Sequence, residues 1–137
     1  MRIYSLMLLF FVAAVLLSCE CEELTISEPA SPDTFIVTEV LQEGGFYLVF
    51  NRPVDTLSLF PEENIIVEGA TITSVQAFGS DLSVSLNNFT NCSGQECLAT
   101  IRLISDEPTG IRSIEGELLD GDYDGMEGGD FAASLEF

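Results

Sequence analysis

The stretch LSVSL, Leu82 to Leu86, alternates apolar side chains with serine hydroxyls at every second position. Successive side chains of a β-strand point to opposite faces, so this pattern predicts a strand with one face in a core and one face toward water. FAASLEF, Phe131 to Phe137, repeats the alternation. FYLVF, Phe46 to Phe50, is apolar on both faces, which is expected for a strand in the middle of a sheet.

The remainder of the chain after residue 34 shows the same period of two and no convincing helical spacing. Turn signals such as Gly44-Gly45 and Gly79-Ser80-Asp81 separate the apolar runs. About seven short strands of this kind predict an all-β fold, a two-sheet antiparallel sandwich, with a small barrel as the main alternative. The other predicted strands cover residues 35–41, 65–68, 70–76 and 98–104.

The first 18 residues have the composition of an export signal, with one Arg followed by an apolar run from about Leu6 to Leu17. The run is shorter than the roughly 20 residues that cross a bilayer, and its length fits the hydrophobic region of a signal peptide. Residues 19–33 contain two prolines and few apolar side chains, so they are expected to form a flexible tether. The predicted organisation is a signal peptide at 1–18, the tether at 19–33 and one domain at 34–137.

The sequence Leu16-Leu17-Ser18-Cys19 resembles the lipobox of bacterial lipoproteins. In that family the Cys is acylated and becomes the first mature residue. The resemblance implies a lipid membrane as the partner of Cys19 and an extracytoplasmic, membrane-anchored location in the bacterial cell envelope. Each buried methylene contributes about 0.8 kcal/mol, so several acyl chains would hold the protein at a bilayer almost permanently. The alternative is an ordinary secretory signal followed by an incidental Cys.

The composition is strongly acidic, with 23 Asp and Glu against 4 basic residues, all Arg, and a formal charge of −19. Such a surface repels nucleic acid, which is therefore not expected as a partner. The absence of Lys together with many carboxylates is typical of a salt-adapted protein. The alternative is an acidic envelope protein from an ordinary habitat. The chain also has no His, which removes the usual general base, the usual zinc ligand and the Ser-His or Cys-His nucleophile. We therefore expect no enzymatic activity.

Cys92 and Cys97 flank a polar Ser-Gly-Gln-Glu segment between two apolar runs. Exported proteins meet an oxidising compartment, so the pair is predicted to form a disulfide, worth roughly 2 kcal/mol in the chain-entropy model. A metal site built on the same two thiols is the weaker alternative, since no His or second Cys pair lies nearby.

The stretch LLDGDYDGMEGGDF, residues 118–131, poses a question of cation binding. Alternate carboxylates on a curled backbone can face one point, and Ca²⁺ takes six to eight oxygen ligands. The sequence leaves two hypotheses of equal weight, a calcium loop between strands or an acidic turn exposed to solvent, and binding of another cation is a minor third. An EF-hand is excluded because no flanking helix is predicted. The candidate Ca²⁺ ligands are Asp120, Asp122, Asp124, Glu127 and Asp130.

The segment Val49 to Asp55 resembles the strand end F-x-x-P-V-D of bacterial Ig-like domains of the S-layer (SbsA) type. The strand at 99–103, the following GIRSIEGELLDGD and the closing strand at 131–137 are similar to later parts of the same family. The resemblance implies an Ig-like sandwich used as a stalk, spacer or adhesive module, without catalysis. Ser113 and Glu117 stand where the family has Asp and Asn in a turn, so this turn must be held differently.

These patterns together predict a membrane-anchored extracytoplasmic lipoprotein whose Ig-like domain is a structural or adhesive binding module, with Ca²⁺ as a candidate stabiliser. Its partner would be an envelope protein or a glycan. The alternative is an accessory carbohydrate-binding subunit of an envelope complex, although the chain has no Trp to stack on sugars. A glycosidase using carboxylates alone ranks last, since it needs two carboxyl groups at a defined separation within a cleft.

Overall fold

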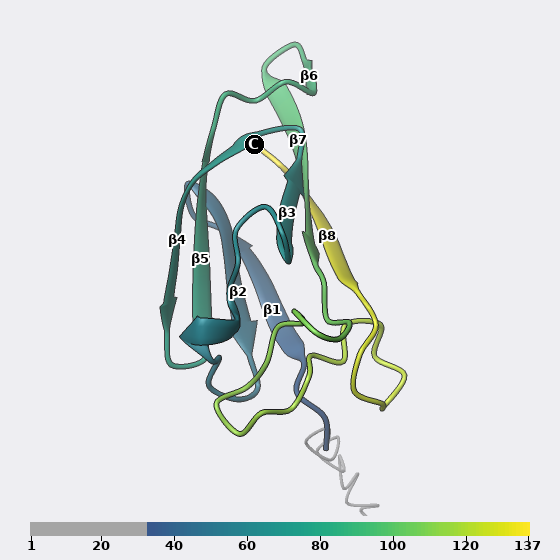
Figure 1. The fold of residues 1–137 in the computed structure, drawn as a ribbon. Coiled ribbons are helices and arrows are strands. Elements are labelled where there is room, and N and C mark those ends of the chain that lie inside the picture. The colour runs from purple at the N-terminus through teal and green to yellow at the C-terminus, as the bar shows by residue number, and fades with distance from the viewer. Residues whose placement is uncertain (1–32) are drawn as a thin grey trace, which may run out of the picture. The chain divides into compact units, whose positions relative to one another are not determined.

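The computed structural model describes residues 33–137, which form two antiparallel β-sheets that pack face to face (Figure 1). The predicted signal peptide, Cys19 and the tether up to residue 32 lie outside the described residues. The elements are β1 (Val37–Gln42), β2 (Gly45–Phe50), the 3-10 turn η1 (Thr56–Ser58), β3 (Ile65–Glu68), β4 (Thr71–Phe78), β5 (Asp81–Asn87), β6 (Cys92–Ser93), β7 (Glu96–Leu103) and β8 (Phe131–Glu136).

The strand order matches that of an immunoglobulin domain. The first sheet has the order β1-β2-β5-β4, and in the second sheet β7 lies between β3 and β8. If the strands of the two sheets are lettered A to G along the chain, with β6 left out, the order is ABED against CFG, as in constant-type Ig domains. The prediction of an Ig-like antiparallel sandwich is therefore confirmed, and a closed barrel does not form.

Each predicted apolar run becomes a strand, with ends that shift by a few residues. FYLVF becomes β2, which lies between β1 and β5, so its apolar character on both faces is explained. The first run begins two residues later than predicted, because Phe35 forms an isolated parallel bridge with Leu119 instead of joining β1. The sequence did not predict β6 or η1, which are two and three residues long and too short to show a period.

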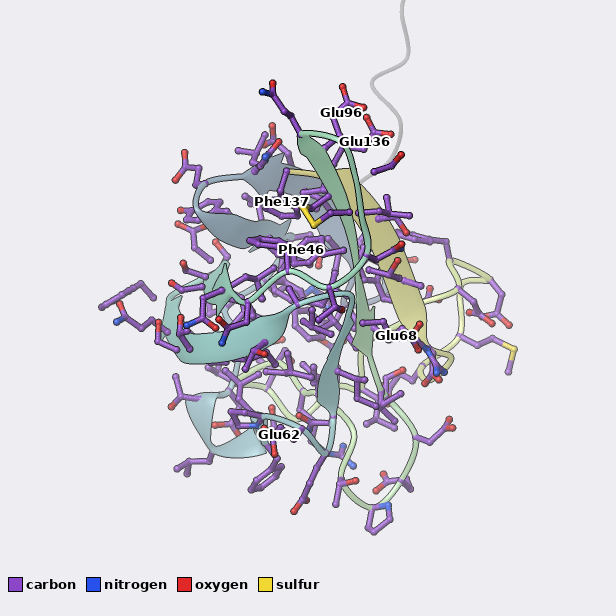
Figure 2. All side chains as sticks on the ribbon, turned by 90° about the horizontal axis from the view of Figure 1, so that it is seen from above. Phe46, Glu62, Glu68, Glu96, Glu136 and Phe137 are labelled. Atoms are coloured by element: carbon purple, nitrogen blue, oxygen red, sulfur yellow. A yellow bond between two sulfur atoms is a disulfide. The ribbon has the colours of Figure 1, made fainter. Side chains whose placement is uncertain are left out.

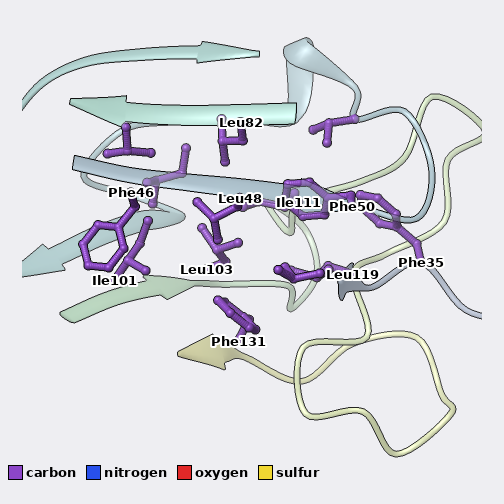
Figure 3. Close-up of a cluster of buried hydrophobic side chains, with 14 of the residues drawn as sticks. Phe35, Phe46, Leu48, Phe50, Leu82, Ile101, Leu103, Ile111, Leu119 and Phe131 are labelled. Atoms are coloured by element: carbon purple, nitrogen blue, oxygen red, sulfur yellow. The ribbon is translucent and has the colours of Figure 1, made fainter. Parts of the chain in front are cut away.

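The core lies between the two sheets. It is built by the side chains at every second position of the strands, which point inward. Leu82 and Val84 of β5 are fully buried, as are Ile101 and Leu103 of β7. Figure 3 shows Leu82 and Leu48 on one side of this cluster and Ile101 and Leu103 on the other. The Phe35 ring stacks on Phe50 with 5.2 Å between centroids. Since the core fills the space between the sheets, loops and strand edges carry the accessible chemistry.

Candidate functional site

The acidic loop between residues 120 and 130 begins beside the first described residues of the domain. The backbone N–H of Asp120 donates to the Phe35 carbonyl at 2.8 Å, and the Thr34 hydroxyl donates to Asp120 Oδ2 at 2.8 Å. In Figure 1 the loop lies at the end of the sandwich where the described chain enters. The candidate cation loop therefore lies at the end of the domain where the described residues begin.

Asp120 is the residue that shapes this loop. It is only 1% exposed, and beyond Thr34 its carboxylate accepts the N–H groups of Asp124 at 3.1 Å and Gly125 at 3.0 Å. These bonds curl the backbone, and Gly125 reaches a φ of +84°, which glycine adopts without strain. Three donors on one buried carboxylate account for the shape of the loop without a cation.

Tyr123 closes the loop against the first sheet. Its hydroxyl donates to the Val37 carbonyl at 2.8 Å, and its ring meets Phe131 edge-on at 6.3 Å between centroids. Burial of the hydroxyl, and then the charge of Asp120, raise the pKa of Tyr123 above its usual value. The hydroxyl is therefore engaged within the domain, while 52% of the residue stays exposed.

Three of the five predicted calcium ligands come together. One carboxylate oxygen from each of Asp120, Asp122 and Asp124 lies within 4.8 Å of the others. Asp130 instead accepts from Arg102 Nη2 at 3.0 Å, and Glu127 accepts the Leu118 N–H at 3.4 Å. Three carboxylates would supply part of the six to eight oxygens that Ca²⁺ needs, and backbone carbonyls or water would supply the rest. Calcium binding at this loop stays a prediction.

The described part of the chain has no unpaired cation. Arg52 pairs with Glu117, Arg102 with Asp130, and Arg112 with Glu107. Residues 33–137 hold 19 of the 23 acids and 3 of the 4 Arg, so their formal charge is −16. Three acids are matched by Arg and 16 are not, which makes the surface of this domain almost purely anionic.

The turn at residues 113–117 is held by a serine and an ion pair. The buried Ser113 hydroxyl accepts the N–H groups of Glu115 and Glu117, each at 3.3 Å. Glu117 pairs with Arg52, and this hydrogen bond lowers the pKa of the Glu117 carboxyl below its usual value and raises that of Arg52. Ser113 thus fixes the turn by accepting hydrogen bonds from its backbone, as a short polar side chain at this position is expected to do. The predicted difference from the family lies in the ion pair between Arg52 and Glu117.

Cys92 and Cys97 form a disulfide across the β6–β7 hairpin, where they are register partners. The predicted bridge is confirmed, and the alternative metal site falls because the two sulfurs are bonded to each other. A hollow of about 240 Å³ lies beside the bridge and is lined partly by the carboxylates Glu96 and Glu136, both labelled in Figure 2. Glu96 of the hairpin and Glu136 of β8 therefore add negative charge at this end of the sandwich.

Asn64 is a structural residue that the sequence did not reveal. It is fully buried; its amide donates to the carbonyls of Ser58 and Thr109, each at 2.6 Å, and its oxygen accepts the Phe60 N–H at 2.8 Å. The side chain thereby ties η1, the approach to β3 and the loop after β7 into one unit. An Asn after two acids reads as an ordinary turn residue, and nothing local points to a partner 45 positions away.

Comparison with protein-family models, with curated proteins and with solved structures finds no match for this chain. Among residues 33–137, no helix is long and apolar enough to cross a membrane. A function can therefore be argued only from the motifs of the sequence and the chemistry of the domain.

Proposed function

We propose that the protein is a membrane-anchored extracytoplasmic lipoprotein whose single Ig-like domain is a structural or adhesive binding module. The observation that carries the proposal is the lipobox-like Leu16-Leu17-Ser18-Cys19 directly after a signal-like apolar run. The Cys92–Cys97 disulfide supports export, because such bonds form and persist in oxidising compartments. The Ig-like strand order supports a binding role, since many cell-surface modules share this architecture.

The side chains of the domain favour recognition over catalysis. The chain lacks His, and each Arg of the described domain is already paired with a carboxylate. Nucleophilic and acid–base chemistry at neutral pH usually depends on an imidazole, a free cation or a carboxylate with a shifted pKa. The hydrogen bond from Arg52 lowers the pKa of the Glu117 carboxyl, which is the wrong direction for a general acid.

Anchoring is tested by the partition of the expressed protein between membrane and soluble fractions. The wild-type protein should sediment with membranes and gain the mass of its acyl chains. Cys19→Ala should abolish both, because it removes the thiol that is acylated. Cys21→Ala, two residues away, is the matched control and should change neither. An unaltered membrane fraction for Cys19→Ala would contradict the proposal.

Calcium stabilisation of the acidic loop is tested separately. If the three carboxylates hold Ca²⁺, adding it at millimolar concentration to metal-free protein should raise the Tm, and Asp122→Asn combined with Asp124→Asn should remove the shift. Asp106→Asn, another acid of the same domain, should keep it. A Tm that does not respond to Ca²⁺ leaves the hydrogen bonds of Asp120 as the full account of the loop.

A further inference from the structure

Strand β4 is an edge strand of unusual composition for this protein. Its sequence, TITSVQAF from Thr71 to Phe78, has no charged residue and no proline, although 23 of the 137 residues of the chain are acidic. Phe78 at its end is 74% exposed. Soluble proteins usually protect edge strands with charge, proline, bulges or short length, because an open edge pairs with other strands.

The edge strands β1, β3 and β8 each show at least one of those protections. β1 carries the exposed Glu39 and a bulge between Val37 and Glu39. β3 has four residues and ends in Glu68, and β8 has six and ends in Glu136. β4 has a bulge near its start, between Ile72 and Ser74, which leaves Ser74–Phe78 as a regular uncharged edge.

The open backbone groups of β4 can be assigned from its hairpin. Phe78 and Asp81 flank the two-residue turn Gly79-Ser80 and form the hydrogen-bonded pair next to it. Because such pairs alternate along an antiparallel ladder, the N–H and C=O groups of Val75 and Ala77 point away from β5. Within residues 33–137, β4 pairs with no strand except β5 and no other backbone hydrogen bond reaches Thr71–Phe78.

A hollow of about 300 Å³ adjoins the start of this edge. It is lined by apolar side chains of β3 and β4, including Ile66, Val67 and Ile72, and by Glu62. Glu62 and Glu68 are labelled in Figure 2. A strand added alongside β4 could place an apolar side chain in this hollow, and its charged side chains would meet carboxylates.

Charge decides which partner fits. The domain has a formal charge of −16 and its three Arg are all in ion pairs, so a second copy of this chain would be repelled. Glu68 precedes the strand by three residues. Asp81 is the register partner of Phe78 on β5, where it also accepts from the Tyr47 hydroxyl at 2.8 Å. A carboxylate therefore stands near each end of the uncharged strand. A segment with basic residues is attracted to the same surface.

We propose that β4 binds an extended segment of a partner protein by strand addition, and that this segment alternates apolar residues with Lys or Arg. Main-chain hydrogen bonds to Val75 and Ala77 would give affinity, and the hollow and the flanking carboxylates would give selectivity. The inference names the partner chemistry of the binding module proposed above and rests on that role.

The test uses the purified full-length protein in neutral detergent and a fluorescent peptide in which Lys alternates with Val, titrated by anisotropy at about 0.15 M salt. Three peptides are compared: the basic one, one with Glu in place of Lys, and a basic one methylated on alternate backbone nitrogens. The basic peptide should bind, and the other two should bind at least about tenfold more weakly, which corresponds to about 1.4 kcal/mol. Comparable binding of the methylated peptide would show simple charge attraction and overturn the proposal.

Variants locate the site. Ala77→Pro removes an outward N–H, which edge strands tolerate, and should weaken binding at least about tenfold while the circular dichroism spectrum is kept. Ala132→Pro is the matched control on the β8 edge: Cys97 and Phe137 exchange hydrogen bonds, so alternation turns the Ala132 N–H away from β7. It should bind as the wild type does. Equal binding by Ala77→Pro would overturn the proposal.

Two further outcomes are distinguishable. Self-association of the wild-type protein that Ala77→Pro abolishes, without binding of the basic peptide, would assign the edge to a second copy and overturn the choice of partner. Membrane partition does not enter this titration, so loss of peptide binding leaves the anchoring result at Cys19 unaffected, and the two proposals fail independently.

Discussion

At the scale of single residues, Asn64 carries more of the stability than its place in a turn suggests. Replacing it with Leu keeps a similar volume but leaves the Phe60 N–H and the carbonyls of Ser58 and Thr109 without their partner. A buried group left unsatisfied costs about 1–3 kcal/mol, so we expect Asn64→Leu to lower the free energy of unfolding by about 3 kcal/mol or more. Urea denaturation measures this loss.

Asn87→Ala is the control for that substitution. Asn87 is exposed at the end of β5, and surface changes away from special features usually stay within about 0.5 kcal/mol. An Asn64→Leu variant as stable as Asn87→Ala would mean that the three hydrogen bonds contribute no net stability.

The Arg52–Glu117 pair predicts a pH dependence. The pKa of Glu117 is lowered in the folded state, chiefly by the hydrogen bond from Arg52. The stability from this group is therefore present above the ordinary Glu pKa of 4.5 and is lost as pH falls through the lower folded value. Glu117→Gln removes this contribution, so the difference in Tm between the wild type and the variant should shrink as the pH falls from neutral through the folded pKa of Glu117. Parallel curves for the two proteins would contradict it.

The sequence located the acidic loop but not the roles of its members. Five carboxylates within eleven residues could be recognised as a candidate cluster, yet two of them have partners far away in the chain. Thr34 lies 86 positions from Asp120, and Arg102 lies 28 positions from Asp130. Such contacts depend on how β1 and β7 are placed, and local spacing carries no information about that placement.

At the scale of elements, the β6–β7 hairpin should be separable from the rest of the sandwich. The disulfide joins Cys92 of β6 to Cys97 near the start of β7, while the fully buried Ile101 and Leu103 lie toward the other end of β7. Replacing both cysteines with Ser should therefore lower the free energy of unfolding by about 2 kcal/mol and leave the fold intact. Urea denaturation and circular dichroism test the two parts, with Cys21→Ser as the control. Complete unfolding of the double variant would contradict this separation.

Strand positions could be predicted because a half-buried strand has to alternate, as Leu82 to Leu86 shows. Strand order could not be predicted from the same signal. An apolar strand face can be buried against any opposite sheet. The alternation therefore does not distinguish pairing of β2 with β5 from pairing of β2 with β3. The resemblance to Ig-like domains supplied the architecture, and the observed ABED and CFG order agrees with it. The β6 strand escaped prediction because two residues cannot show a period.

At the scale of the whole molecule, charge is the dominant physical feature of the domain. Of its 19 acids, 16 have no Arg partner. Folding brings these carboxylates closer together, so they repel one another more strongly in the folded state than in the unfolded chain. Salt acts on both parts of this balance. It weakens the three ion pairs, each of which is partly exposed and worth about 0–1 kcal/mol, and it also screens repulsion among the unpaired carboxylates.

The unpaired acids outnumber the pairs by 16 to 3, so screening of repulsion should win and stability should rise with salt. We expect the Tm to increase as NaCl is raised from about 0.01 M, where the Debye length is about 30 Å, toward about 1 M, where it is about 3 Å. Glu62→Gln with Glu63→Gln removes two of the unpaired charges, so it should raise the Tm at low salt and flatten the curve. Arg112→Gln, which frees Glu107, should do the reverse. A Tm that falls with salt would mean that the three ion pairs contribute more to stability than the repulsion costs. The unpaired carboxylates would then not be a net source of instability.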